Sequence, residues 1–478
     1  MILGRLSSPV LTVRENYAQA MAVTAPLGSV ISTTTVAVAY AGNGVILATI
    51  LAFIASAFWV YTLTIYSRRI ASAGGYYTFV YAAYRNRALA FTEAIIELSS
   101  FIFLNAVNVM AIYLMISSLL KFYGFREGNI ILPFILGFSL LYPTIVSYVM
   151  HIRRLLGTIV IIVATLEVLL LIALFIVAIR YGFKFNILIP TPDVSLASLA
   201  LAFIIILVSI DGVGTATYLG EETRKPLDNV TKGMWLAFII GGLSMIAGTY
   251  AMIALWPSTL SLISYSEQPL IDIMAGYGLI PAVLVIIIAT KSLLISNIGT
   301  TVAAARILFN LSREKAAPEI FQYTNKYKQP HIATLTVGIV TIIITITSLE
   351  LLGAREAFIQ LGAVTGILWI LGRVIDSAGA PLLLHRLSEV KLSIKNRGVA
   401  IPVITTVLNS IGLLVSTLDI TITSILMLAS ITIVGLTWYT LIARYGMPGE
   451  LVIDNNSNIV KLEDYINIAY KRSNNTVN

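Results

Sequence analysis

Residues 207–226 read LVSIDGVGTATYLGEETRKP, and this stretch decides the fold. It interrupts an apolar segment that begins near residue 196, because Asp211 is followed closely by Gly212 and Gly214. An ionisable side chain is costly at membrane depth unless it faces protein or water, and glycine frees the backbone from helical geometry. The stretch therefore predicts a membrane-spanning helix whose backbone opens near Asp211.

The composition extends this prediction to the whole chain. Of its 478 residues, 58% are hydrophobic and only 11% are charged, and the mean hydropathy is +0.90. A soluble domain carries about 25% charged residues. The sequence predicts an all-α integral membrane protein with about twelve transmembrane helices, each close to the roughly 20 residues that cross a bilayer. The apolar runs lie near residues 17–40, 44–66, 89–119, 130–150, 155–179, 196–220, 233–256, 280–308, 332–353, 356–384, 400–418 and 421–443.

The residue types that are missing or scattered disfavour several classes of function. The chain has no cysteine, and its three histidines fall at predicted span ends on one side of the membrane. No repeated His, Asp or Glu has metal-ligand spacing near an interface, as an integral-membrane enzyme would need. We therefore expect no catalytic residue, no metal site apart from sodium as a candidate coupling ion, and no cofactor.

The distribution of basic residues predicts the orientation. With the N-terminus placed in the cytoplasm, 24 of the 31 Lys and Arg residues fall on the cytoplasmic side, five on the other side, and Lys291 and Arg373 within spans. Basic residues concentrate in cytoplasmic loops, which explains the net charge of +8 without a nucleic-acid partner. We expect a multi-pass protein of the cell (plasma) membrane with both termini cytoplasmic. The N-terminus shows no pattern of a removed signal peptide.

The first predicted span resembles the 207–226 stretch in being interrupted. Pro26 and Gly28 precede a run of serines and threonines, which favours a helix break near residues 27–32. A helix that is kinked but continuous is the alternative. A second interruption at 209–214 comes five spans later, where the helix runs the opposite way. Paired broken helices in oppositely oriented halves are typical of inverted-repeat secondary transporters, whose substrate site lies at the breaks.

Two charged residues are predicted at matching depth in the membrane. Glu167 lies about twelve residues into the fifth span and Lys291 about eleven into the eighth, which corresponds to roughly 16–18 Å from the span ends. An isolated charge at this depth is expensive, so our hypothesis is that the two pair or share a proton. The alternative is that serine, threonine or backbone groups satisfy each one separately.

Glu221 and Glu222 lie where the sixth span ends, and carboxylates at a helix C-terminus oppose the helix dipole. They need cationic partners, which the cytoplasmic loops supply. We interpret them as part of an inner gate, with a solvated run of charges as the alternative.

Other charged residues within or beside the spans favour structural roles. Glu93 and Glu97 are four residues apart and share a helix face, and Arg373 and Asp376 are spaced for an ion pair within one helix. From Gly446 the chain turns polar and rich in asparagine, which predicts a mostly disordered cytoplasmic tail.

The stretch SIDGVGTATYLGEETRKP resembles the sixth-span signature of the amino acid, polyamine and organocation transporter superfamily, amino acid permease type. There a short polar break precedes a helix that ends in Glu-Glu, a basic residue and Pro. SAGGYYTFVYAAY after the second span and AAARILFNLSREKAAP after the eighth extend the resemblance over roughly residues 15–385.

This resemblance implies a LeuT-type fold, a 5+5 inverted repeat with broken helices 1 and 6. The implied organisation is a cytoplasmic N-terminus at 1–14, a first repeat of five spans at 15–190, a second at 191–386, two peripheral spans at 387–445 and a cytoplasmic tail at 446–478.

The resemblance also implies where a substrate binds. In the family, amides at the first break bind the substrate carboxylate, and Val30 stands here where the family has glycine, which narrows the site. Carbonyls at the second break are implied to accept the substrate ammonium, with Asp211 binding it directly or assisting gating. The candidate substrate-binding residues are Gly28, Ser29, Val30, Ile31, Val208, Ser209, Ile210, Asp211, Gly212 and Gly214.

The function implied is a secondary active transporter for amino acids that works by alternating access, with proton- or sodium-coupled symport. Its partners would be a small-molecule substrate, an amino acid or amine, and the lipid bilayer. Several proton-coupled members have a lysine where this chain has Glu167, so Glu167 and Lys291 are the coupling-ion candidates. The alternatives are a polyamine, organic-cation or other small-metabolite transporter of the same fold, or an amino acid exchanger. An integral-membrane enzyme or a sensor is disfavoured.

Overall fold

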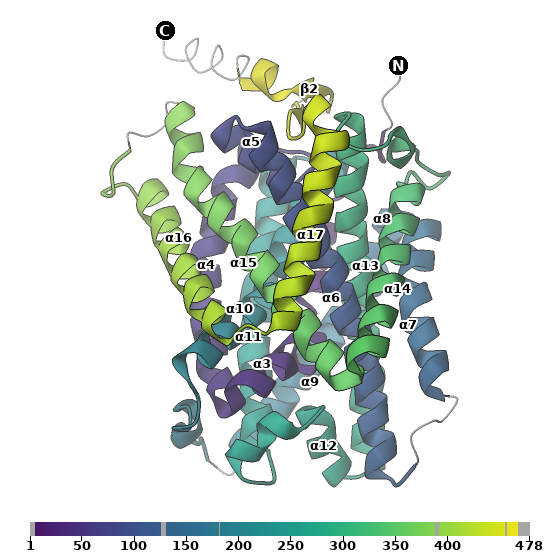
Figure 1. Cartoon of the computed structure of the whole chain (residues 1–478), viewed down its shortest axis with the longest axis vertical. Coiled ribbons are helices and arrows are strands. Elements are labelled where there is room, and N and C mark those ends of the chain that lie inside the picture. Colours follow the sequence, from purple (N-terminus) through teal and green to yellow (C-terminus); the bar gives the residue numbers. More distant parts are fainter. Residues whose placement is uncertain (1–4, 126–130, 181, 388–391, 455–456, 467–478) are drawn as a thin grey trace.

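The computed structural model describes residues 5–125, 131–180, 182–387, 392–454 and 457–466, and these form a helical bundle (Figure 1). Most of the bundle is α-helix. The α-helices are α1 (Val13–Thr24), α2 (Pro26–Ile31), α3 (Thr33–Ala41), α4 (Val45–Ser67), α5 (Tyr76–Tyr84), α6 (Arg87–Phe122), α7 (Ile131–Val149), α8 (Ile152–Arg154), α9 (Ile161–Ile179), α10 (Leu196–Ile210), α11 (Pro226–Ala254), α12 (Pro269–Gly276), α13 (Leu279–Arg313), α14 (His331–Leu352), α15 (Ala354–Arg386), α16 (Arg397–Ser416) and α17 (Ile422–Leu441).

Shorter elements connect these helices. One is a π-helical segment, η2 (Leu155–Val160), and strands β1 (Leu451–Ile453) and β2 (Ile459–Lys461) pair antiparallel with Val452 opposite Val460. The 3-10 segments are η1 (Gly42–Gly44), η3 (Phe185–Leu188), η4 (Asp211–Glu222), η5 (Leu260–Tyr265), η6 (Glu319–Gln322), η7 (Thr417–Asp419) and η8 (Ala443–Tyr445).

Eleven helical segments of the described residues are long and apolar enough to cross a membrane. Each overlaps one of the predicted spans from the second to the twelfth. The first predicted span, 17–40, has no segment of its own: α1 and α2 are short, and α3 is counted with α4 in the segment Thr33–Ser67. The prediction of an all-α membrane protein is therefore confirmed.

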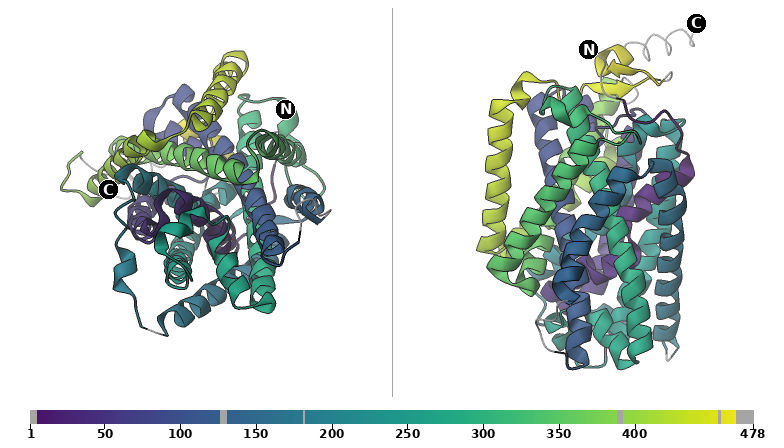
Figure 2. Two further views of the ribbon diagram at one scale, coloured as in Figure 1. Left: turned by 60° about the horizontal axis from the view of Figure 1, so that its bottom comes forward. Right: turned by 90° about the vertical axis from the view of Figure 1, so that its right-hand side faces the viewer.

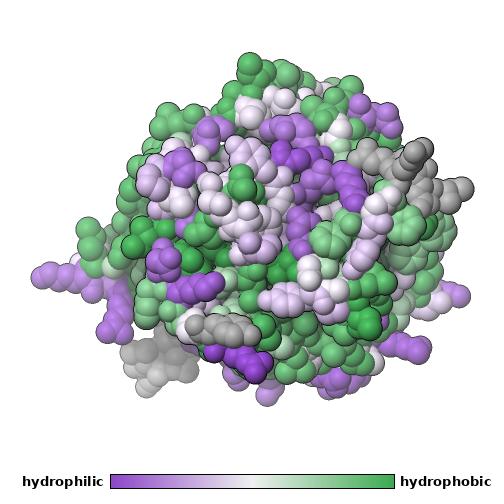
Figure 3. Space-filling view, turned by 90° about the horizontal axis from the view of Figure 1, so that it is seen from below, coloured by the Kyte–Doolittle hydropathy of each residue, from purple (hydrophilic) through white to green (hydrophobic). Residues whose placement is uncertain are grey.

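The long helices run side by side along the bundle, and burial separates central helices from peripheral ones (Figure 2). The most apolar window of α6 is 83% buried, whereas those of α16 and α17 are only 22% and 11% buried. Seen from the end opposite the tail, hydrophilic residues gather toward the middle of the surface and hydrophobic residues surround much of it (Figure 3). An apolar belt around polar ends suits a bilayer.

The C-terminal segment is ordered where the structure describes it, which corrects the prediction of disorder from Gly446 onward. After η8 the chain forms the β1–β2 hairpin, and residues 451–453 and Leu462 are buried. This hairpin lies beside α5 at one end of the bundle, the tail end (Figure 1). The few apolar residues of the segment stand among asparagines, so its composition concealed the residues that pack.

The tail is attached to the bundle by hydrogen bonds to two other segments. Glu314, which follows α13, accepts hydrogen bonds from the backbone N–H groups of Gly449 (2.9 Å) and Leu451 (3.0 Å). The Ile453 N–H donates to the carbonyl of Ala71, 2.9 Å away. The tail therefore joins the loop before α5 to the end of α13.

The contribution of Glu314 to the stability of the folded chain is expected to fall as the pH rises through about 7. Burial raises the pKa of Glu314 to about 7 from its ordinary 4.5, against the opposing effect of the Gly449 and Leu451 amides. A carboxyl that binds its proton more tightly in the folded than in the unfolded chain stabilises folding at low pH, and this contribution is lost as the pH rises through its folded pKa. Equilibrium unfolding at pH 6 and pH 8 measures this contribution.

Glu314→Gln is the matched control because it keeps the size of the side chain without a titrating proton. At each pH the free energy of unfolding of the variant is subtracted from that of the natural chain, which cancels the pH dependence of the other groups. This difference is expected to fall by about 1.4 kcal/mol from pH 6 to pH 8. A difference that stays constant over this range would contradict the role of Glu314.

Candidate functional site

The first predicted span is interrupted twice. Ala25, between α1 and α2, has φ 36° and ψ 68°, and Pro26 opens α2. Proline lacks a backbone N–H and its ring clashes with the preceding helical turn, so the helix stops here. Ser32, between α2 and α3, has φ −100° and ψ −90°. The break predicted near 27–32 is thus present as one interruption just before that stretch and one at its end.

Side chains from two other helices bind the backbone at the start of α2. The Leu27 N–H donates to Oε2 of Glu167 in α9 at 3.3 Å, and the Gly28 N–H donates to Oγ of Ser292 in α13 at 2.9 Å. The Ser29 N–H, in contrast, donates within its own segment to the Ala25 carbonyl. Glu167, predicted as a coupling residue, therefore lies directly beside the predicted substrate-binding segment.

The hypothesis that Glu167 pairs with Lys291 is wrong. The Lys291 side chain is exposed, and within the described residues no ion pair joins it to Glu167. Successive residues of a helix point about 100° apart, so Ser292 faces the interior while Lys291 faces away from it. Residue counts gave Glu167 and Lys291 the same depth in the membrane, but they did not show in which direction each side chain points from its helix.

The second interruption is a change of helix type, which corrects the prediction that the backbone opens at Asp211. The α10 helix ends at Ile210 and continues as the 3-10 helix η4. A 3-10 stretch of this length is unusual and marks strain or a functional hinge. The glycines are needed for close packing: a Cβ on Gly212 would lie 3.0 Å from the Thr24 backbone, and one on Gly214 would lie 1.9 Å from the Tyr76 hydroxyl oxygen.

The structure brings the two interruptions together. The hydroxyls of Thr33, which follows the first break, and Ser209, which precedes the second, are 2.6 Å apart. The side chain of Val30 packs toward α11, where a Cβ on Gly248 would lie 3.2 Å from its Cγ2. All ten predicted substrate-binding residues are buried, so these segments are closed off from solvent in this conformation.

Asp211 lies beside a charged group that the sequence did not assign to the site. Its Oδ2 is 3.7 Å from Nε of Arg373 in α15, and Arg373 Nη1 is 2.8 Å from Oε1 of Glu97 in α6 and 3.8 Å from Oδ2 of Asp376. The predicted ion pair of Arg373 with Asp376 is present but is the longest of the three. Glu93 lies beside Glu97 on the same helix face. The sequence did contain a sign that Arg373 belongs to a functional site, because an arginine in the middle of a membrane span is rare and usually functional.

Glu221 and Glu222, at the tail end of η4, have the basic partners that were expected. Glu222 Oε2 accepts a hydrogen bond from Nε of Arg306 at 2.7 Å, and Glu221 Oε2 accepts one from Nη2 of Arg313 at 2.8 Å. The Ser7 hydroxyl also donates to Glu222, at 2.8 Å. The pairs join the end of η4 to α13 and to the N-terminal segment, which corrects the alternative of a solvated run of charges.

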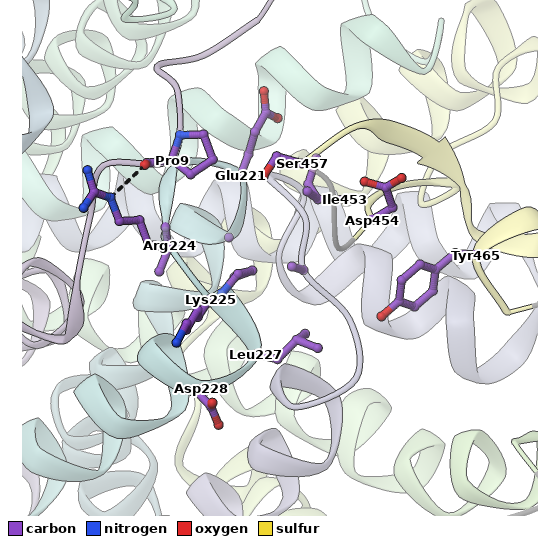
Figure 4. Close-up of a pocket in the computed structure, with 14 residues that line it drawn as sticks. Pro9, Glu221, Arg224, Lys225, Leu227, Asp228, Ile453, Asp454, Ser457 and Tyr465 are labelled. Atoms are coloured by element: carbon purple, nitrogen blue, oxygen red, sulfur yellow. Dashed lines mark hydrogen bonds between the residues drawn. The ribbon is translucent and has the colours of Figure 1, made fainter. Parts of the chain in front are cut away.

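A pocket of about 440 Å³ opens next to these ion pairs (Figure 4). The N-terminal segment closes one side of it, since Arg224 Nε donates to the Pro9 carbonyl at 3.2 Å. The tail forms another side. The lining residues are Pro9, Ala71, Gly220, Glu221, Thr223, Arg224, Lys225, Pro226, Leu227, Asp228, Ile453, Asp454, Ser457 and Tyr465.

A helical membrane bundle whose interior holds interrupted helices and buried charges has the architecture of a membrane transport protein. A family model described as amino acid permease matches residues 18–448, so the chain belongs to the amino acid permease family of the amino acid, polyamine and organocation superfamily. The resemblance seen in the sequence is thereby confirmed. The family is one of transporters and not of enzymes. A comparison with curated proteins gave no match.

Proposed function

We propose that this protein is a secondary active transporter for amino acids that works by alternating access with proton- or sodium-coupled symport. One observation carries the proposal: the interrupted first span and the α10–η4 junction meet at the Thr33–Ser209 contact, inside a chain of the amino acid permease family. Meeting interruptions near mid-membrane are where inverted-repeat transporters bind their substrates. The two repeats of a LeuT-type fold would be residues 15–190 and 191–386.

The substrate would bind between the two interruptions. Gly28–Ile31 would offer backbone amides to a carboxylate, and Val208–Asp211 would offer carbonyls and a carboxyl group to an ammonium. The contact between the Glu167 carboxyl and the Leu27 amide supports a role of Glu167 in ion coupling. A proton or an ion that changed the charge of Glu167 would alter the backbone directly before the segment that receives the substrate.

The tail end would be the cytoplasmic side of the plasma membrane, with both chain termini there, as the basic loops favour. The Glu221–Arg313 and Glu222–Arg306 pairs support an inner gate, because they tie η4 to α13 at the end where the bundle would open. In alternating access these pairs separate when the substrate leaves, and the difference in substrate affinity between the two states drives the cycle.

Transport of polyamines, organic cations or other amines is the second candidate. The observation that favours it is again Glu167, because this carboxyl binds the Leu27 amide directly before Gly28–Ile31, the segment that is expected to receive a substrate carboxylate. A substrate without a carboxylate would leave this contact undisturbed. An amino acid exchanger would share all of these contacts, and counterflow without an ion gradient distinguishes it from a symporter.

A thermal-shift screen of the purified protein against amino acids, polyamines and choline-like cations tests the choice of substrate class, since a bound ligand stabilises the folded state by mass action. Zwitterionic amino acids are expected to raise the melting temperature. Stabilisation only by cations that lack a carboxylate would replace the amino acid assignment with the amine one.

The Asp211→Asn variant is expected to bind the stabilising ligand at least tenfold more weakly while remaining folded, because a lost hydrogen bond between charged groups costs about 1.5–3 kcal/mol. Asn keeps the size of the side chain next to Arg373. The measurement is the ligand concentration at half-maximal thermal shift. Asp193→Asn, an exposed carboxyl before α10, is the control. Equal affinities of all three proteins would remove Asp211 from the site.

A further inference from the structure

A compact group of ionisable side chains surrounds Arg373 in the interior of the bundle. The group consists of Arg373 and Asp376 from α15, Glu93 and Glu97 from α6, and Asp211 at the α10–η4 junction, and we call it the Arg373 cluster. Each of the five residues is 0% exposed. Asp211 belongs to the candidate substrate site, so the cluster begins at that site and extends to α6.

The charge of Arg373 is fixed. Its guanidinium lies over the rings of Trp59, Tyr76 and Trp369, at 4.6, 4.5 and 4.9 Å from their centroids. Aromatic faces attract a cation, and a guanidinium does not lose its proton in proteins. The cluster therefore contains one permanent positive charge held in an aromatic box.

Four carboxyl groups share this one cation. Glu97 is the closest at 2.8 Å, whereas Asp211 and Asp376 stand at 3.7 and 3.8 Å. Glu93 has no ion-pair partner among the described residues. Four ionised carboxylates would leave three uncompensated negative charges in a dry interior, and a buried carboxyl in that position takes a proton instead.

Further polar groups in the same place lack hydrogen-bond partners. Neither carboxyl oxygen of Glu93 or Asp376 is hydrogen-bonded within the described part of the chain, and the buried hydroxyls of Tyr76 and Tyr218 are also unpartnered there. The Tyr218 hydroxyl lies next to Glu97. These donors and acceptors can therefore respond to a proton that arrives or leaves.

The backbone makes room for two of the carboxyls. A Cβ on Gly372 would lie 2.6 Å from Oε1 of Glu93 and 2.8 Å from Oε1 of Glu97. Any other residue at this position would push both carboxyls away from α15. The small residue thus allows the acids of α6 to approach the helix that carries Arg373.

We propose that the Arg373 cluster is a proton-binding site, with Glu93 holding the exchangeable proton and Arg373 linking its occupancy to Asp211. Release converts the Glu93 carboxylic acid to a carboxylate and one proton. Because Arg373 is shared, a change of charge at Asp211 alters how strongly Arg373 stabilises an ionised Glu93. The ligand is a proton and not a metal cation, since the guanidinium among the carboxyls repels a metal cation but tolerates a neutral acid.

The titratable groups that face the cluster come from α4, α5, α6, η4 and α15. Tyr66 and Tyr84 donate to the backbone carbonyls of Asp376 and Ile375 and so hold this turn of α15. Among the residues that the structure describes, they are Tyr66 from α4, Tyr76 and Tyr84 from α5, Glu93 and Glu97 from α6, Asp211 and Tyr218 from η4, and Arg373 and Asp376 from α15.

Infrared absorption of the full chain in lipid nanodiscs tests the proton site, because a protonated carboxyl absorbs separately from a carboxylate. At pH 7 the Glu93→Gln variant is expected to lose the protonated-carboxyl absorption of one group. Glu463→Gln is the control, since that side chain is 71% exposed. Identical spectra of the natural chain and Glu93→Gln from pH 5 to pH 9 would overturn the proposal.

Two further variants complete the test. Should Glu93→Gln not fold, Glu93→Asp keeps a carboxyl and is expected to move the frequency of the same band, and an unmoved band would overturn the assignment. Asp211→Asn is expected to shift the pH at which the Glu93 band disappears, and an unchanged pH would overturn the link through Arg373. The role of this proton site in transport rests on the proposed function, whereas the proton site itself does not. The spectra are recorded without substrate. They can therefore contradict the proton site while the thermal-shift screen supports amino acid binding, and they can support the proton site while the screen contradicts amino acid binding.

Discussion

The Arg306→Met variant is expected to lose about 3–5 kcal/mol of stability, because it leaves Glu222 buried without its counter-charge. Both side chains of this pair are 0% exposed, and Nε of Arg306 is 2.7 Å from the carboxylate. Methionine fills a similar volume, so the loss reports the charge more than a cavity. Equilibrium unfolding in mixed micelles measures it.

Two other variants show whether the loss arises from the unpaired charge. The double variant Arg306→Met with Glu222→Gln removes both charges and is expected to recover most of the stability. Lys121→Met breaks an exposed pair, with side chains 41% and 27% exposed, and is expected to cost no more than about 1 kcal/mol. Equal losses in the single and double Arg306 variants would contradict a buried ion pair at this position.

The Arg373→Met variant is expected to be strongly destabilised at pH 8 and much less so at pH 5. Without Arg373 the four carboxyls of the cluster have no cation among the described residues, and a broken buried pair costs about 3–5 kcal/mol. In this variant the four carboxyl groups therefore bind protons more tightly in the folded than in the unfolded state. Stability therefore rises as the pH falls from 8 to 5.

Arg373→Lys is the matched variant, because it keeps the charge and loses the planar fork that contacts both Glu97 and the aromatic rings. Its loss of stability is expected to be intermediate and to depend less on pH. Unfolding measured at both pH values compares the three proteins. A deficit of Arg373→Met that is the same at pH 5 and pH 8 would show that the carboxyls take up no protons in its place.

The sequence was sufficient to predict the eleven helical segments of the described residues that are long and apolar enough to cross a membrane, since run length and hydropathy determine them directly. Pro26 was sufficient for the first interruption, because its effect on a helix is local. The glycines beside Asp211 allowed two interpretations, because glycine occurs both where a helix backbone opens and where two segments pack closely. Only the positions of Thr24 and Tyr76 in the structure show that Gly212 and Gly214 are needed for close packing.

The partners of the buried charges could not be predicted from spacing alone. Depth in the membrane follows from residue counts, but the direction of a side chain around its helix depends on how the helices pack. This is why Glu167 was assigned to Lys291 and lies instead beside the Leu27 amide. It is also why Arg373 was assigned to its own helix, although Glu97 on α6 is its nearest acid.

Uptake into liposomes tests the central claim most directly. Purified protein is reconstituted and supplied with radiolabelled amino acids, with an inward proton gradient, an inward sodium gradient or neither, and protein-free liposomes serve as the control. The account predicts accumulation of at least one amino acid above its equilibrium level with one of the gradients. No amino acid uptake under any gradient, together with uptake of a polyamine or choline-like cation, would contradict it.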